Sequence, residues 1–138
     1  MKKYFTDGSA EPNPGQGGFA VVLDGEPVAL GTEAESTNIR MEGKALIEAY
    51  KLAQPQDEIY TDSEFWVNVL TKWAPGWQSK GWQKKGGPIK NLELVQELYA
   101  LYQEKPEVKL IWTRGHVGTE GNELADQWAN RARLGETL

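Results

Sequence analysis

Short apolar segments bounded by turn-forming residues occupy the first quarter of the chain, a pattern typical of β-strands. Residues 3–6 and 18–24 are rich in aromatic and β-branched residues, so we expect two strands there and a third over 28–34. Residues 6–18, TDGSAEPNPGQGG, contain four glycines and two prolines, which predicts a tight loop between the first two strands. Asp7 is then expected to end the first strand.

Apolar residues recur at helical spacing farther along the chain. Residues 40–53 predict a helix, with Thr37 or Asn38 as its N-cap. Residues 64–73 predict a short amphipathic helix that the Pro-Gly pair at 75–76 ends. The stripes at 92–102 and 124–132 predict two more helices, and strands are expected at 58–62 and 108–112.

The order of these elements predicts an α/β fold. Three strands in succession favour a β-meander, and the later alternation of helices and strands favours βαβ units with right-handed crossovers. Together they predict one mixed sheet covered by helices. At 138 residues the chain is expected to form one domain, residues 1–138.

Composition excludes several classes of protein. Without cysteine the chain cannot form disulfides, thiolate nucleophiles or cysteine–zinc sites. No apolar run approaches the roughly 20 residues that span a bilayer, so we expect no membrane partner. The opening residues, MKKYFTD, lack the apolar stretch of a signal peptide, which makes a cytoplasmic location the expectation.

The net charge of −5 conceals an uneven distribution. Residues 72–90, KWAPGWQSKGWQKKGGPIK, hold five lysines and no acid, and we call them the basic segment. The rest of the chain carries 10 basic and 20 acidic residues. Clustered lysines beside tryptophans are typical of nucleic-acid binding, although a solvated surface also explains lysines.

Four acids lie near the ends of predicted elements: Asp7 and Asp62 at strand ends, and Glu42 and Asp126 in the early turns of helices. If the first and fourth strands run parallel and side by side, the two aspartates emerge at one edge of the sheet. Any one acid alone is explained as well by the preference of Asp for turns and of acids for helix N-termini.

The segments around these acids occur in a distinctive order: TDGS (6–9), NIRME (38–42), YTDSEF (60–65), TRGH (113–116) and GNELADQWAN (121–130). With these motifs, the basic segment and PIKNLEL (88–94), nearly the whole chain resembles the type 1 ribonuclease H family. The resemblance implies a ribonuclease H-like fold whose five-stranded mixed sheet begins with an antiparallel meander, and in which residues 72–90 form a basic protrusion. It also implies an endoribonuclease that hydrolyses the RNA strand of RNA–DNA hybrids, leaving 5′-phosphate and 3′-hydroxyl ends.

The resemblance assigns metal binding to four carboxylates, which we call the acidic site: Asp7, Glu42, Asp62 and Asp126. It implies two ions bridged by Asp7, with Asp126 on the water-activating ion and the other two acids on the leaving-group ion. Four carboxylates held together repel one another, and oxygen ligands suit Mg²⁺ or Mn²⁺. We expect two Mg²⁺ ions as cofactor, with Mn²⁺ as a substitute.

His116, the only histidine of the chain, lies in a glycine-flanked turn ten residues before Asp126. The resemblance makes it an auxiliary catalytic group that carries a proton or assists product release. A structural or solvated histidine is the alternative. The resemblance also places RNA-strand contacts at Asn13 and Asn38, where glycines in the opening loop would let the backbone approach the minor groove.

The DNA strand is expected on the aromatic and basic side of the molecule. The resemblance assigns a DNA-phosphate pocket to Thr37 and Asn91, and contacts with the sugar–phosphate backbone to Phe65, Trp73 and Trp77. Phosphate contacts from the basic segment are expected at Lys80, Lys84 and Lys85. The other tryptophans, Trp66, Trp112 and Trp128, fall in helix or strand patterns that predict core positions, and Trp82 lies within the basic segment.

Some positions depart from the family pattern. Ile39 stands where Asn or Gln is common, and Glu64 stands where many relatives have Gln. Glu33 and Glu35 precede the proposed pocket threonine, where relatives often carry a basic residue, so a weaker pocket is expected.

Three alternatives remain. A related nuclease or polynucleotidyl transferase acting on DNA alone would share the four acids. A hybrid-binding protein without catalysis would have no need of all of them. A ribonuclease H domain detached from a reverse transcriptase would have the same chemistry, although a chain that begins with Met at its first strand favours a free-standing, monomeric enzyme. Cleavage of different duplexes separates the first two alternatives from a hybrid nuclease.

Overall fold

The computed structural model describes residues 1–114 and 120–138. Its strands are β1 (Lys3–Glu11), β2 (Gly15–Leu23), β3 (Glu26–Ser36), β4 (Glu58–Thr61) and β5 (Lys109–Trp112). Its helices are α1 (Asn38–Leu52), α2 (Glu64–Asn68), the π-helical turn η1 (Val69–Trp73), α3 (Ala74–Ser79), α4 (Leu92–Glu104) and α5 (Glu120–Arg133). Within these two ranges, no helix is both long and apolar enough to cross a membrane.

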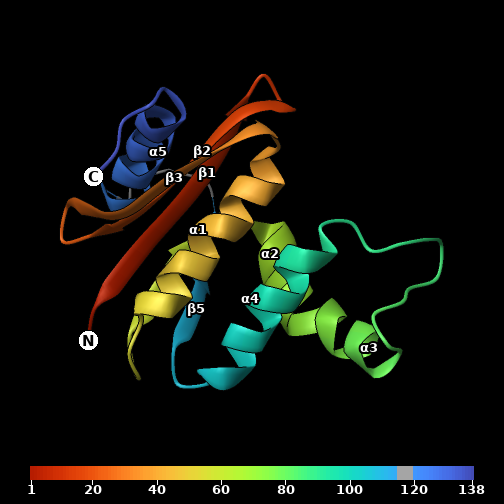
Figure 1. Ribbon diagram of the computed structural model, residues 1–138. Helices are drawn as coiled ribbons and strands as arrows, with labels where there is room; N and C mark the ends of the chain where they lie inside the picture. The colour runs from red at the N-terminus through yellow and green to blue at the C-terminus, as the bar shows by residue number, and fades with distance from the viewer. Residues whose placement is uncertain (115–119) are drawn as a thin grey trace.

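One mixed sheet organises the molecule, with strand order β3-β2-β1-β4-β5. β1, β2 and β3 pair antiparallel, whereas β4 runs parallel to both β1 and β5. The predicted five-stranded sheet with an initial meander is therefore confirmed. α1, α2 and α4 lie together on one side of this sheet, and α5 lies on the other (Figure 1).

The hairpin between β1 and β2 is longer and its turn is shorter than the sequence predicts. The strands pair from Tyr4 opposite Leu23 to Glu11 opposite Gln16, so only residues 12–14 form the turn. Asp7 pairs with Ala20 in the middle of β1. The expectation that Asp7 ends the first strand is therefore wrong, and so is the loop predicted over residues 6–18.

The glycines of this hairpin lie within strands and allow the helices to pack closely against the sheet, rather than forming a loop. A Cβ atom on Gly17 would meet the Met41 side chain of α1, and one on Gly18 would meet backbone atoms of α5. Because neighbouring strand residues face opposite sides of a sheet, these two contacts place α1 and α5 on opposite faces. On β1, a Cβ atom on Gly8 would collide with the backbone of α1 at Met41 and Glu42.

α1 is anchored at both ends. Thr37 is its N-cap, and the threonine hydroxyl accepts a hydrogen bond from the Arg40 N–H (3.1 Å). At the other end, the Lys105 ammonium donates to the carbonyls of Tyr50 (2.5 Å) and Ala53 (3.0 Å). Between the ends, α1 buries an apolar face against the sheet and α4, in a core centred on Leu46, Ala49, Tyr50, Ile59, Trp66, Val95 and Leu98.

The helix that begins at Glu64 does not stop before the Pro-Gly pair at 75–76, contrary to the sequence prediction. It continues through η1 into α3. Pro75 lies in the first turn of α3, where a backbone N–H has no partner within that helix, so the missing amide hydrogen of proline costs little. α3 and the chain that follows it project from the body of the protein (Figure 1). This projection contains most of residues 72–90, as expected of a basic protrusion.

Candidate active site

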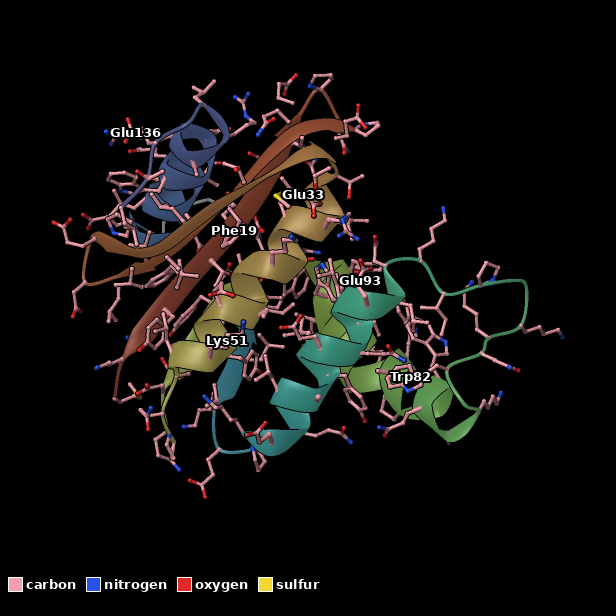
Figure 2. All side chains as sticks on the ribbon, viewed as in Figure 1. Phe19, Glu33, Lys51, Trp82, Glu93 and Glu136 are labelled. Atoms are coloured by element: carbon pink, nitrogen blue, oxygen red, sulfur yellow. The ribbon has the colours of Figure 1, made fainter. Side chains whose placement is uncertain are left out.

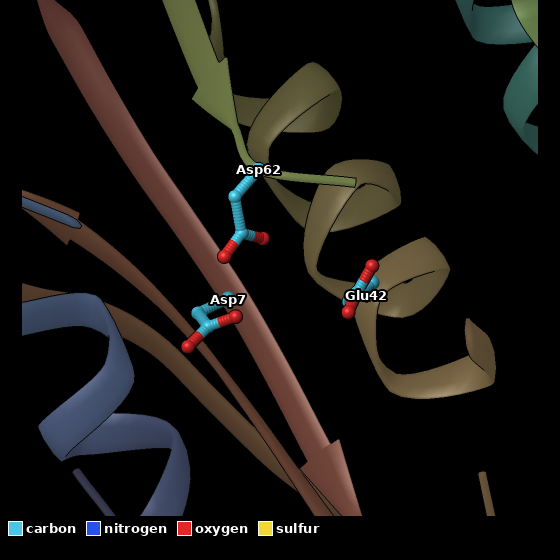
Figure 3. A group of neighbouring side chains, drawn as sticks. All are labelled: Asp7, Glu42 and Asp62. Carbon is cyan, nitrogen blue, oxygen red and sulfur yellow. The ribbon is translucent and has the colours of Figure 1, made fainter. Parts of the chain in front are cut away.

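Three of the four predicted acids converge beside the sheet. Carboxylate oxygens of Asp7, Glu42 and Asp62 all lie within 4.8 Å of one another. Figure 3 shows Asp7 on β1, Asp62 immediately after β4 and Glu42 on α1, with their side chains directed into one space. The sequence analysis identified these acids from separate motifs, and the structure brings their three distant segments together at one point.

The space between these acids exists because β4 is short. β4 pairs with β1 only from Lys3 opposite Glu58 to Phe5 opposite Tyr60. Beyond Phe5, β1 continues with a neighbour on one side alone, so Asp7 faces the gap where β4 has ended. Asp62 follows the last residue of β4 and lies at the same edge, as the sequence predicts for parallel neighbours.

The fourth acid, Asp126, approaches Asp7 from α5. Burial raises the pKa of the Asp7 carboxyl well above its usual range, and the charge of Asp62 and a hydrogen bond with Asp126 raise it further. Asp126 therefore belongs beside Asp7, as predicted.

The environment of Glu42 also disfavours its negative charge. Burial and the neighbouring charge of Asp62 raise the pKa of Glu42 to about 7, although a hydrogen bond with the Ser63 side chain lowers it. Ser63 is buried and also accepts a hydrogen bond from the Trp66 N–H (3.2 Å), which caps α2. The residue after Asp62 thus orients a second acid of the site.

The donor set of this site suits a divalent cation. In this cluster the donors are carboxylate oxygens, the ligands that Mg²⁺ and Mn²⁺ prefer. Burial first, and the neighbouring carboxylates second, raise the pKa values of Asp7 and Glu42, so this site disfavours negative charge. Bound cations would remove this penalty.

Hydrogen bonds tie the strand that ends beside Asp62 to the helix that carries Asp126. The Thr113 N–H donates to the Thr61 carbonyl (2.8 Å), and the buried Asn122 amide donates to the Thr113 hydroxyl (2.7 Å). Asn122 lies one helical turn before Asp126, so both face the same side of α5. Our sequence analysis missed Asn122, although its i, i+4 spacing from Asp126 was a usable signal.

The predicted RNA-strand residues form a connected surface. The Asn38 side-chain oxygen accepts from the Ala10 N–H (2.7 Å), and the Asn13 side-chain oxygen accepts from the Asn38 N–H (3.1 Å). Nearby, the Ser9 hydroxyl donates to Asn130 of α5 (3.2 Å). The structure therefore joins the turn of the first hairpin to the start of α1, next to the acidic site.

The predicted DNA-strand aromatics also gather in one place. Phe65 and Trp73 lie with ring centroids 6.0 Å apart, and Trp73 and Trp77 lie 6.1 Å apart. These three rings line a groove of about 530 Å³ together with Lys84, Lys90 and the chain around Pro88. The lysines of the basic segment, Lys72, Lys80, Lys84, Lys85 and Lys90, are all exposed.

The remaining predictions for single residues have different outcomes. His116 lies outside the described residues. Trp66 is fully buried, as predicted, but Trp112 is 40% exposed because it stands at the end of the edge strand β5, so its core prediction is wrong. The Trp112 indole N–H donates to the Asp62 carbonyl (3.3 Å), which places the ring beside the acidic site. Trp128 is half-buried, with the Arg131 guanidinium 4.1 Å from its ring centroid.

Comparisons with known proteins identify one family. The family model described as RNase H matches residues 2–133. A ribonuclease H from Cupriavidus pinatubonensis is 43% identical over 135 residues, covering 92% of this chain and 91% of that protein. A ribonuclease H from Agrobacterium fabrum is also 43% identical, covering 92% of this chain and 90% of the relative.

Solved structures give the same result for the fold. The chain superposes with a TM-score of 0.82 on LC9-RNase H1, described as a type 1 RNase H with the type 2 active-site motif, at 29% identity over 99% of this chain and 73% of that one. It superposes with a TM-score of 0.72 on the RNase H domain of the prototype foamy virus, at 23% identity, covering 96% and 94% of the two chains. The second likeness shows the fold alone.

Proposed function

The chain belongs to the ribonuclease H family, nucleases that act on the RNA strand of RNA–DNA hybrids, and we propose that its acidic site cleaves that strand by two-metal-ion catalysis. The products are a 5′-phosphate and an RNA 3′-hydroxyl, and the enzyme acts as a monomer. The observation that carries this proposal is the convergence of the carboxylates, drawn from four distant segments of the chain.

The four carboxylates would hold two Mg²⁺ ions, for which Mn²⁺ could substitute. When bound, two such ions activate a water and stabilise the leaving oxygen of the phosphodiester. Asp7 is the most central ligand, because it lies near both Asp62 and Asp126. Ser63 keeps the Glu42 carboxylate directed at the same point. His116 acts as an auxiliary group that carries a proton or assists product release.

Recognition of the RNA strand falls to Asn13 and Asn38. The carbonyl oxygen of each side-chain amide is already occupied by a backbone N–H, so its NH₂ group remains as a donor. The 2′-hydroxyl, which distinguishes RNA from DNA, can accept such a hydrogen bond. The connection between the two asparagines holds them in one arrangement before substrate binds.

The aromatic groove and the basic segment bind the DNA strand. The exposed face of Trp73, together with Phe65 and Trp77, packs against the sugar–phosphate backbone. Lys80, Lys84 and Lys85 provide charge along the protrusion. Thr37 and Asn91 hold one DNA phosphate near the start of α1.

A panel of labelled duplexes tests this function. With Mg²⁺, the protein should cut the RNA strand of an RNA–DNA hybrid and leave RNA–RNA and DNA–DNA duplexes intact, and EDTA should stop the reaction. The products should accept ligation at the new 5′-phosphate without prior phosphorylation. Cleavage of DNA–DNA at a comparable rate would instead support the DNA-directed alternative, and binding without cleavage would support a non-catalytic protein.

A further inference from the structure

A network of ion pairs joins three elements beside the proposed DNA-phosphate pocket. Arg40, in the first turn of α1, pairs with Glu33 of β3 (Nε to Oε1, 2.8 Å) and with Glu93 at the start of α4 (Nη1 to Oε1, 3.2 Å). Lys44 adds a second cation at 2.9 Å from Glu33. Figure 2 shows Glu33 and Glu93 near the N-terminal end of α1. The two cations and two anions cancel.

The part of the network formed by Arg40 and Glu33 is more enclosed than ordinary surface ion pairs, whereas Glu93 is 66% exposed. The side chains of Arg40 and Glu33 are only 21% and 26% exposed, and Glu33 also accepts from the Ser36 hydroxyl (2.8 Å). Hydrogen bonds from Arg40 lower the pKa of Glu33 to about 2. Because Arg40 and Lys44 both pair with Glu33, its repulsion of a nearby phosphate should be weaker than its position in the sequence suggests. Glu35 remains exposed.

Arg40 also contacts both residues of the proposed pocket. Its backbone N–H donates to the Thr37 hydroxyl oxygen, and its Nη1 donates to the Asn91 side-chain oxygen, each over 3.1 Å. A guanidinium has only donors, so it must face the amide oxygen of Asn91 and leave the NH₂ group directed elsewhere. The Thr37 hydroxyl accepts the N-cap hydrogen bond from the backbone N–H at position 40, which does not depend on the arginine side chain, and keeps its own proton available.

The conformation of Asn91 supports the same conclusion. It is the N-cap residue of α4, a position at which an asparagine side chain ordinarily accepts from the helix backbone. Here it makes no such bond, and its backbone is left-handed (φ 59°, ψ 35°). Its side chain is instead committed to Arg40, 51 residues away in the sequence.

We propose that Arg40 is a positioning residue for the DNA strand: its side chain holds Asn91 with the amide donors free for one phosphate, beside the Thr37 hydroxyl, while its own charge is occupied by two glutamates. This inference rests on the proposed function, because it assumes that these two residues bind a DNA phosphate. It assigns the third part of the pocket to a residue that is not expected to touch the substrate.

Substitution of Arg40 tests the proposal through hybrid binding. Arg40→Gln should raise the KM for a hybrid about tenfold, the worth of one or two hydrogen bonds to a charged group, and change kcat less than about twofold. Arg40→Lys keeps the positive charge but not the planar guanidinium, so it should give an intermediate KM. Because the lysine can still pair with the glutamates, a raised KM in this variant cannot be attributed to a loss of folding. Arg131→Gln is the matched control, since it removes an arginine–glutamate pair (3.0 Å) between the end of α5 and Glu136 in the C-terminal tail, and it should leave KM unchanged.

Hybrids carrying one uncharged methylphosphonate, placed in turn at each DNA position, test two claims separately: that the pocket binds a DNA phosphate, and that Arg40 acts through this pocket. In the unsubstituted protein, one position should raise KM by about tenfold, the worth of a charge-assisted hydrogen bond. In Arg40→Gln, the same replacement should add less than about twofold, because the phosphate contact is already impaired. If no position matters in the unsubstituted protein, the pocket itself is wrong. If one position is sensitive, but the methylphosphonate raises KM by the same factor in Arg40→Gln as in the unsubstituted protein, then Arg40 does not act through the pocket. That result would overturn the inference.

Discussion

Asp7 shares one small space with the three other acids of the proposed site, so at the scale of single residues it is the most sensitive test. Asp7→Asn keeps the shape of the side chain but removes the charge that would hold the proposed cations. We expect cleavage with Mg²⁺ to fall at least about a thousandfold, because both ions of the proposed mechanism depend on this residue. Hybrid binding, measured by fluorescence anisotropy, should change less than about threefold, because the DNA and RNA contacts lie elsewhere.

Asp24→Asn, in the exposed turn between β2 and β3, serves as the control and should retain full activity. Near-normal turnover by Asp7→Asn would contradict the assignment of the acidic site. Loss of both binding and thermal stability would show instead that Asp7 has a structural role.

Glu42 makes the stability of the metal-free protein depend on pH. In the unfolded chain Glu42 loses its proton near its ordinary pKa of 4.5, whereas in the folded protein it does so at about 7. Stability from this group is therefore complete below pH 4.5 and is lost as the pH rises to about 7. Glu42→Gln avoids this loss, so with EDTA at pH 8 the variant should be more stable by on the order of 2 kcal/mol.

Urea unfolding from pH 4.5 to 8 measures this effect. The two proteins should converge at the acidic end of the range, and added Mg²⁺ should reverse their order at pH 8 because the variant has lost a ligand. A difference between them that does not vary with pH would contradict the account given for Glu42.

The sequence predicted the residues of the acidic site better than the residues that support them. Asp7, Glu42 and Asp62 stand in short motifs that are recognisable without a structure, and the fold brings them together. The contact between Arg40 and Asn91 spans 51 residues and leaves no local pattern. Supporting contacts of this kind depend on how elements pack, which periodicity does not describe.

At the scale of elements, the attachment of α5 decides where Asp126 lies. Asn122→Ala removes a buried amide and its hydrogen bond to the half-buried Thr113 hydroxyl. We expect a loss of about 1–2 kcal/mol of stability, measured by urea unfolding. The Mg²⁺ concentration for half-maximal cleavage should also rise several-fold, because α5 no longer holds Asp126 firmly.

Gln127→Ala, on the exposed side of the same helix, provides the comparison and should leave both quantities unchanged. If Asn122→Ala lowers stability but leaves the Mg²⁺ dependence unaltered, Asn122 supports the fold without positioning Asp126.

Element boundaries were the weakest part of the sequence prediction, for physical reasons that individual residues show. Gly8, Gly17 and Gly18 suggested a loop, yet they lie within strands because helices press closely on them. Pro75 suggested a helix end, yet it lies in the first turn of α3, where proline is tolerated. In each case, packing between elements overrides a local preference.

At the scale of the whole molecule, charge separation should govern substrate affinity. The basic segment projects from an otherwise acidic body, and its lysines are exposed. Replacing Lys80, Lys84 and Lys85 together by Gln should weaken hybrid binding and reduce the slope of log K against log salt by up to about 2–3, since each lost phosphate contact removes roughly 0.9. Binding titrations from 50 to 300 mM KCl would measure this.

The matched control replaces three exposed lysines outside the segment, Lys2, Lys3 and Lys109, and should leave the slope unchanged. An equal change in both triple variants would mean that total charge matters and that the protrusion has no special role.

Two of the glycines that allow the helices to pack closely, Gly8 and Gly18, limit which sequence changes this enzyme can tolerate. Gly8 lies beside the backbone of Met41 and Glu42, and Gly18 lies beside that of α5, so the distance between the helices and the sheet is set where the sheet has no side chain. A single methyl group at either position would act as a wedge, moving Glu42 or Asp126 away from Asp7. The positions of two proposed cation ligands therefore depend on glycines that have no side-chain chemistry of their own, and a comparison of active-site residues alone would overlook them.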